Sequence, residues 1–255
     1  MNKKLLIYSF VCAFLILFYL CVPSQVNLIK KREKDPLYQL NMGLLFLNEG
    51  KIDLAIIHLQ KCAQLDPKNY KTYNALGLSY TIKREWDKAI SYFEKSLGIN
   101  PEFTEVHNNL GIIYQEKGDF ERAKKEFEKV ISDQNYQQKE ISYYNLARLY
   151  YIQKNYEESF KMINLAIEKR NHYSIAHNLR GILLQEKGKL KEAEHSFRKA
   201  LEFTPDDVVI NENLIRILIR LDKKEEALMI LNKILPLAQD QETRERLKNI
   251  LEQNK

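Results

Sequence analysis

The chain has 255 residues, 45% of them hydrophobic and 29% charged, which is typical of a folded protein and excludes a disordered one. With only 8 glycines and 6 prolines, the sequence offers few turns, so we expect helices joined by short connections and an all-α fold. The formal net charge of +6 is concentrated in the first 35 residues, while the rest mixes both signs and lacks the basic stripe of a nucleic-acid-binding protein.

The first predicted element is the uncharged run LLIYSFVCAFLILFYLCV, residues 5–22. As a helix it would span about 27 Å, close to the hydrocarbon thickness of a bilayer. Lys3 and Lys4 precede it as in an export signal, but the run is longer than the core of a cleaved signal peptide. We therefore expect one N-terminal transmembrane or signal-anchor helix in residues 1–22, followed by a basic linker over residues 23–35.

Two alternatives remain for this segment. Cleavage after Ser24 would release a soluble periplasmic binding module, and lipidation of Cys21 would make a lipoprotein, although Leu20 is not the small residue that usually precedes a lipidated cysteine. The basic residues of 30–34 favour a cytoplasmic location for the C-terminal side of the segment, whereas the start MNKK favours export. We expect a membrane-anchored repeat region outside the cytoplasm of a bacterial cell, with an inner-membrane protein facing the cytoplasm as the alternative.

A period of 34 residues organises the next part of the chain. It divides residues 36–241 into six units, 36–69, 70–103, 104–139, 140–173, 174–207 and 208–241, with two extra residues inside 132–139. The eighth position of the units is small in most of them: Gly43, Gly77, Gly111, Ala147, Gly181 and Ile215. The twentieth position is small throughout: Ala55, Ala89, Ala123, Ser159, Ala193 and Ala227. Two helices can approach closely where small residues meet, so each unit is predicted to be an antiparallel helix pair.

Helix breakers recur at two places in the period. Gly50, Gly118 and Gly188 fall between the two helices of a pair, and Pro67, Pro101 and Pro205 fall between pairs. Between these breaks, large residues hold the eleventh and twenty-fourth positions, where they fill the space beside the close contact.

The best-preserved stretches are YNALGLSY with DKAISYFEKSLGINP, and HNNLGIIY with ERAKKEFEKV. They resemble the tetratricopeptide repeat, in which Leu-Gly, Tyr, Ala, Phe and Pro recur at fixed offsets. The resemblance implies a right-handed superhelical solenoid of six helix hairpins, with residues 242–255 as a C-terminal capping helix.

The same resemblance implies a concave groove lined by the first helix of each pair, which would bind a protein or peptide partner. The positions that face such a groove carry amides able to clamp a peptide backbone: Asn74, Asn108, Asn109, Asn145, Asn178 and Asn213. Each of them could equally do no more than solvate the groove or cap a neighbouring turn. In the fourth unit Tyr144, Arg148 and Tyr151 combine stacking with a charge, and Arg216 and Arg220 continue a cationic wall toward the C-terminus.

Catalytic motifs are missing from the sequence. It contains no Gly-rich phosphate loop, no nucleophile elbow and no HExxH. The five histidines share no ligand-like spacing, and the three cysteines form no CxxC pair. We expect no enzyme, no cofactor, no metal and no small-molecule substrate.

Within the family, six units after an export-like segment, together with EVHNNLGIIYQEKGDFERAKKEF and QNYQQKEISYYNLARLYY, are similar to the pilotins of type IV pili. In those envelope lipoproteins a longer linker containing a tyrosine likewise separates the third and fourth units. The similarity implies a role in helping a secretin ring reach or assemble in the outer membrane. We therefore expect a membrane-tethered, non-catalytic scaffold in envelope assembly, with a cytoplasm-facing scaffold that recruits an enzyme complex as the alternative.

Overall fold

The computed structural model describes residues 32–252, which form the α-helices α2 to α14 and no strand. The predicted membrane segment 5–22 and Cys21 lie outside these residues. Within the described part, none of the helices combines the length and the apolar composition needed to cross a bilayer.

The helices follow one another in pairs. Their bounds are α2 (Pro36–Asn48) and α3 (Ile52–Leu65), α4 (Tyr70–Ile82) and α5 (Trp86–Ile99), α6 (Glu105–Glu116) and α7 (Phe120–Ser132), α8 (Lys139–Ile152) and α9 (Tyr156–Lys169), α10 (Ser174–Glu186) and α11 (Leu190–Phe203), and α12 (Val208–Arg220) and α13 (Lys224–Ile234). A short 3₁₀ helix, Leu235–Leu237, leads to α14 (Gln241–Glu252).

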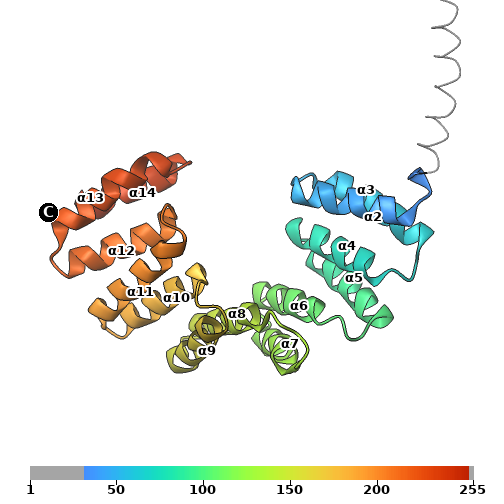
Figure 1. Cartoon of the computed structure of the whole chain (residues 1–255), viewed down its shortest axis with the longest axis horizontal. Coiled ribbons are helices and arrows are strands. Elements are labelled where there is room, and N and C mark those ends of the chain that lie inside the picture. The colour runs from blue at the N-terminus through green and yellow to red at the C-terminus, as the bar shows by residue number, and fades with distance from the viewer. Residues whose placement is uncertain (1–31, 253–255) are drawn as a thin grey trace, which may run out of the picture. The chain divides into compact units, whose positions relative to one another are not determined.

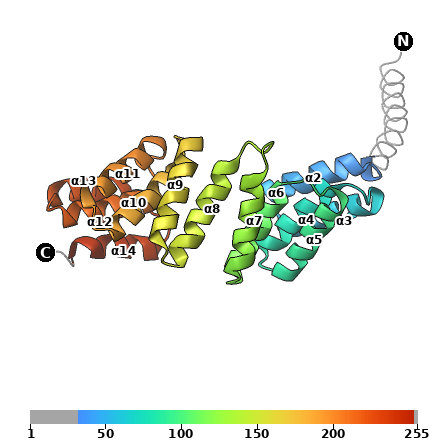
Figure 2. The same ribbon diagram turned by 90° about the horizontal axis from the view of Figure 1, so that it is seen from below.

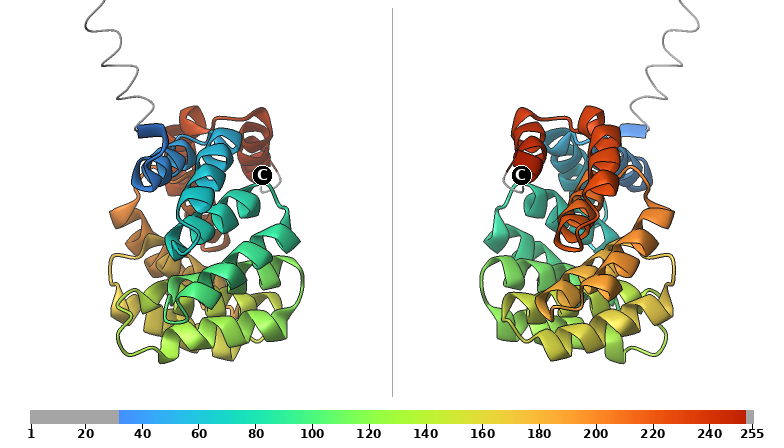
Figure 3. Two further views of the ribbon diagram at one scale, coloured as in Figure 1. Left: turned by 90° about the vertical axis from the view of Figure 1, so that its right-hand side faces the viewer. Right: turned by 90° about the vertical axis from the view of Figure 1, so that its left-hand side faces the viewer.

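The chain divides into two compact units, residues 1–109 and 110–255. The described part of the N-terminal unit holds α2 to α5 and the start of α6. The C-terminal unit holds the rest of α6 and the helices from α7 to α14, which follow one another in chain order (Figures 1 and 2). The end view on the right of Figure 3 shows α13 and α14, drawn in red, at the C-terminal end of that unit.

Side-chain caps explain why several helices begin where they do. Asp35 accepts a hydrogen bond from the backbone N–H of Leu37, with Pro36 at the first helical position. Asn69 and Asp207 cap α4 and α12 in the same manner. These short polar side chains satisfy N–H groups that have no partner inside the helix.

The turn inside each pair depends on one left-handed residue. It is glycine in three units, Gly50, Gly118 and Gly188, with φ of 71°, 76° and 72°. In the other three it is Arg84, Lys154 and Asp222, with φ of 57°, 60° and 60°. The N–H after this residue closes the turn onto a carbonyl five residues back, as from Asp119 to Tyr114 at 2.8 Å. The three glycine turns are where the sequence predicts them.

The two helices of a pair approach closely at the glycine of the eighth position. The sequence suggests that Gly111 makes room for Ala123, but a Cβ built at Gly111 would meet the ring of Phe127 at 2.5 Å. Gly77 and Gly181 face Phe93 and Phe197 at the same distance. An aromatic ring of the partner helix therefore fills the space that a side chain at the glycine would need, and these rings are fully buried.

The C-terminal unit continues this core to its last helix. Buried side chains run without a break from Leu184 and Phe197 through Leu218 and Leu231 to Leu247 of α14. Because α14 contributes apolar residues on one side only, it covers the last pair and turns its charged side to solvent.

Replacing Gly181 with alanine is expected to lower the free energy of unfolding by about 1–2 kcal/mol, because the strain of overpacking exceeds the gain in helix propensity. The double variant Gly181→Ala/Phe197→Ile copies the residues at the same positions of the fourth unit, Ala147 and Ile163, and is expected to recover part of the loss. Urea denaturation of the purified variants measures both effects.

Gly98→Ala is the matched control, since a Cβ at Gly98 has no neighbour within 4 Å and the position lies on the exposed side of α5. It is expected to stabilise the protein by about 0.5–1 kcal/mol. An equal stabilisation by Gly181→Ala would show that the ring of Phe197 does not confine the site.

Candidate functional site

The predicted asparagines of the N-terminal unit tie neighbouring first helices together. Asn74 lies on α4 and Asn109 on α6, both half-buried. The Nδ2 of Asn109 donates a hydrogen bond to Oδ1 of Asn74 over 3.3 Å. Asn108, also on α6, is half-buried and has a partner of its own.

The C-terminal unit repeats this arrangement. Nδ2 of Asn213 on α12 donates to Oδ1 of Asn178 on α10 over 3.0 Å. As in the other bond, the residues are 35 positions apart. Asn145 on α8 is buried and has an interaction partner of its own. The bonded amides therefore hold successive first helices in register. The donors Asn109 and Asn213 each keep one N–H and a free carbonyl oxygen for an external peptide, whereas the acceptors Asn74 and Asn178 each keep both N–H groups and one lone pair.

The predicted cluster of the fourth unit lies on one face of α8, because Tyr144, Arg148 and Tyr151 are spaced four and three residues apart. The rings of Tyr144 and Tyr173 pack in a T-shaped arrangement, with centroids 5.5 Å apart. Burial raises the pKa of the Tyr144 hydroxyl, an effect that the positive charge of Arg148 opposes. Burial likewise raises the pKa of Tyr173 to about 12. Tyr144 is thus largely a packing residue, with a polar tip that stays protonated at neutral pH.

Tyr151 and Arg148 are more available than Tyr144. Tyr151 packs against Tyr156, with centroids 5.8 Å apart, and burial raises the pKa of its hydroxyl. Arg148 is half-buried between the two tyrosine positions, and no carboxylate of the described residues forms an ion pair with it. A half-buried guanidinium without an acidic partner is a strong candidate for binding an external carboxylate or carbonyl.

At the C-terminal end, two arginines share one buried carboxylate. Glu212 of α12 is 8% exposed. Its Oε1 accepts from Nη2 of Arg216 at 2.7 Å, and its Oε2 accepts from Nε of Arg246 on α14 at 3.1 Å. Arg216 is exposed but is held by an ion pair within its own helix. Arg220 is also exposed and lies in the last turn of α12, where the helix dipole favours a cation.

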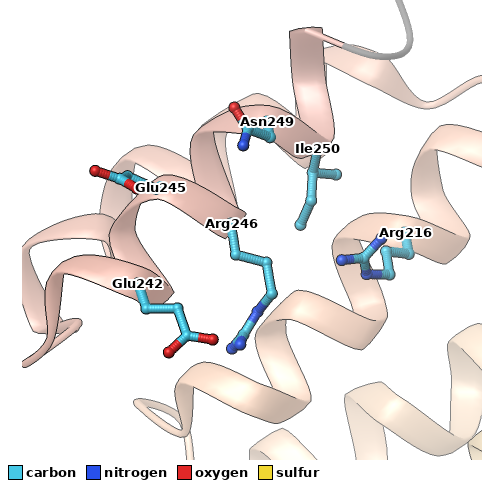
Figure 4. Close-up of a pocket in the computed structure, with 6 residues that line it drawn as sticks. All are labelled: Arg216, Glu242, Glu245, Arg246, Asn249 and Ile250. Carbon is cyan, nitrogen blue, oxygen red and sulfur yellow. The ribbon is translucent and has the colours of Figure 1, made fainter.

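A pocket of about 400 Å³ lies between α12 and α14. Figure 4 shows Arg216 and Arg246 directed into the space between the helices, whereas Glu245 and Asn249 point away from α12. The sequence-based site omits Glu212 and Arg246. Two signals could have identified them, since Glu212 and Arg216 have ion-pair spacing on a helix, and Arg246 follows Glu212 by one period of 34 residues.

The histidines have structural roles where their bonds are defined. His58 shares a hydrogen bond of 2.7 Å with Oε1 of Gln39, and Nε2 of His177 donates to the carbonyl of Asn171 at 2.7 Å. Burial lowers the pKa of His177 and keeps it neutral. Among the described residues, no three His, Cys, Asp or Glu side chains are grouped closely enough to hold a metal ion.

Glu212→Ala is expected to loosen α14, because it removes the carboxylate that links Arg246 of α14 to Arg216 of α12. Amide hydrogen exchange in 241–250 should accelerate, with a loss of only about 1 kcal/mol in stability, since both arginines are exposed to solvent. The exposed Glu225→Ala on α13 serves as control and should leave exchange in α14 unchanged. Equal exchange in both variants would mean that apolar packing alone holds α14.

Comparisons with known proteins agree with this architecture. The model of a tetratricopeptide repeat-like domain matches residues 113–208, and tetratricopeptide repeat models match residues 38–69, 82–140 and 184–253. No curated protein matches the sequence with significance.

Solved structures with the same fold include proteins of pilus biogenesis. PilF of Pseudomonas aeruginosa aligns with a TM-score of 0.73 at 16% identity, over 86% of this chain and 99% of its own. PilW, a widely conserved type IV pilus biogenesis factor, aligns with a TM-score of 0.73 at 16% identity, over 83% and 98%. YrrB, which has an unusual peptide-binding site, aligns with a TM-score of 0.52 at 19% identity, over 75% and 97%.

At these identities the structural likeness establishes the fold, while the family models establish the family. The repeat resemblance seen in the sequence is confirmed, and no catalytic family is among the matches. The chain belongs to the tetratricopeptide repeat family of protein-interaction scaffolds.

Proposed function

We propose that this scaffold binds an acidic peptide segment of a protein partner on the face formed by α8, α10 and α12 of the C-terminal unit. The observation that carries the proposal is the half-buried Arg148, which is flanked by tyrosines and has no carboxylate partner among the described residues. Its planar fork suits a carboxylate, and the ring of Tyr151 offers apolar contact beside it. The Asn178–Asn213 bond holds the neighbouring helices in place, which limits the ordering that binding requires.

We further propose that the partner belongs to a bacterial envelope assembly of the type IV pilus kind. Support comes from the alignment with PilF and PilW, which extends over nearly the whole of both proteins and over most of this chain. In this proposal residues 5–22 tether the array to the membrane and the array is extracytoplasmic. Two alternatives are an inner-membrane scaffold that faces the cytoplasm and recruits an enzyme complex, and a periplasmic module released after cleavage.

A photo-reactive phenylalanine analogue at Tyr151 is expected to cross-link an envelope protein in living cells. Adding Arg148→Glu should reduce the cross-linked product about tenfold, because the substitution places two like charges together in a half-buried site. Mass spectrometry identifies the product.

Lys169→Glu, a charge reversal on the exposed surface of α9, is the matched control and should leave the product unchanged. A product that persists equally with Arg148→Glu would refute binding at Arg148. A cytoplasmic enzyme as the main product would favour the alternative scaffold.

Protease treatment of intact spheroplasts is expected to digest the array, with loss of a C-terminal epitope, because the proposal places it outside the cytoplasm. A cytoplasmic marker protein must survive the same treatment. Survival of the epitope until the membrane is lysed would place the array in the cytoplasm and contradict the envelope proposal, while leaving peptide binding at Arg148 to its own test.

A further inference from the structure

A second, smaller pocket lies inside the fifth helix pair, away from Arg148. Its volume is about 190 Å³, and its lining comes from α9, the connection after it, α10 and α11. The lining residues are Ile167, Asn171, His177, Arg180, His195, Ser196 and Lys199. None of them is a carboxylate, and Arg180 and Lys199 bring two positive charges.

Arg180 occupies a position that the other units fill with an apolar residue. The seventh position of the first helix is Met42 in the first unit and a buried leucine in four others: Leu76, Leu110, Leu146 and Leu214. In the fifth unit it is an arginine, whose Nε is buried and has no hydrogen-bond partner among the described residues. A buried guanidinium nitrogen without an acceptor is unfavourable, so the arrangement requires an explanation.

Ser196 opens the space in front of Arg180. The same position of the second helix carries Tyr92, Met162 and Ile230 in other units, all larger than serine. The hydroxyl of Ser196 donates to the backbone carbonyl of Glu192 at 3.0 Å, so the side chain turns back onto its own helix. At two facing positions the fifth unit thus has an arginine where other units have an apolar residue and a serine where several of them have a larger side chain.

The surrounding groups leave the pocket electropositive. Lys199 Nζ forms an ion pair with Oε2 of Glu202 at 2.6 Å, which offsets one positive charge at the rim. His177 donates its Nε2–H to the backbone carbonyl of Asn171 and adds an uncharged side chain to the lining, while His195 lies exposed on α11. The charge of Arg180 has no counterpart among the described residues.

We infer that this pocket binds a phosphoryl oxyanion, either inorganic phosphate or the phosphate group of a small phosphorylated ligand, with Arg180 as the principal ligand-binding residue. The guanidinium of Arg180 and the ammonium of Lys199 supply charge-assisted donors for the several acceptor oxygens of a phosphate. A volume of 190 Å³ holds a phosphate group but is below the roughly 300 Å³ at which pockets for drug-sized ligands begin.

Thermal denaturation of the full-length protein tests the site, comparing sodium phosphate with sodium chloride at equal ionic strength. Phosphate is expected to raise the melting temperature saturably, and chloride is not. Arg180→Leu installs the residue that other units use, so the variant should fold, melt no lower than the wild type in chloride, and bind phosphate at least about tenfold more weakly.

Ser196→Met provides a second variant that keeps every charge and fills the pocket with the residue found at Met162. It should also weaken phosphate binding, whereas Lys191→Ala, which removes an exposed charge from the same helix, should not. Equal shifts in phosphate and chloride, or an unchanged phosphate response in Arg180→Leu, would overturn the site. If the phosphate response persists in Ser196→Met but is lost in Lys191→Ala, phosphate acts through the surface charge of the protein and the proposed site is refuted.

The two ligand sources are distinguished by repeating the titration with O-phosphoserine. Binding of O-phosphoserine as tight as that of phosphate supports a phosphorylated ligand. Binding of inorganic phosphate alone supports a free anion.

Discussion

The helix pairs with glycine or alanine at the eighth position depend on one steric condition, namely that this small residue leaves space for the twenty-fourth residue of the unit. Where the first is glycine, as at Gly77 and Gly181, the second can be a fully buried phenylalanine. Where the first is Ala147, the second is Ile163, so the two volumes change in opposite directions. The paired helices can therefore pack closely in these units although the residues vary, and closely packed pairs can stack on one another.

The proposed binding face shares its residues with the contacts that hold the array together. Asn178 and Asn213 bond to each other, Tyr144 packs against Tyr173, and Arg216 is held by Glu212. Such bonds fix the surface before a partner arrives, which lowers the entropic penalty of binding. Because a large part of the polar lining is engaged in contacts within the protein, binding specificity depends on the few groups, such as Arg148, that have no such ion pair.

Local sequence rules were enough to predict the helices, the glycine turns and the spacing of the pairs, since each depends on residues close together in the chain. They were not enough for contacts between units. Periodicity placed Gly111 near Ala123 but could not show that the ring of Phe127 enters the space first. The asparagine hydrogen bonds and the Glu212–Arg246 pair join residues about one period apart. Their geometry therefore depends on how one repeat packs on the next within the same compact unit.

Two further features of the chain lie beyond such local rules. The pocket around Arg180 results from a missing volume at Ser196, which no motif records. The membrane segment 5–22 and lipidation at Cys21 stay predictions, because they lie outside the described residues.

The left-handed turn residues have a consequence for how the array resists local opening. Glycine takes this conformation without steric strain, whereas Arg84, Lys154 and Asp222 carry a penalty of about 1 kcal/mol each. Along the chain the two kinds alternate strictly, so no two consecutive repeats are both strained. In a linear array each repeat is stabilised mainly by its neighbours, and a weak repeat between two relaxed ones opens less readily than two weak repeats side by side. The alternation therefore works against the formation of one continuous weak stretch at which unfolding or proteolysis would begin.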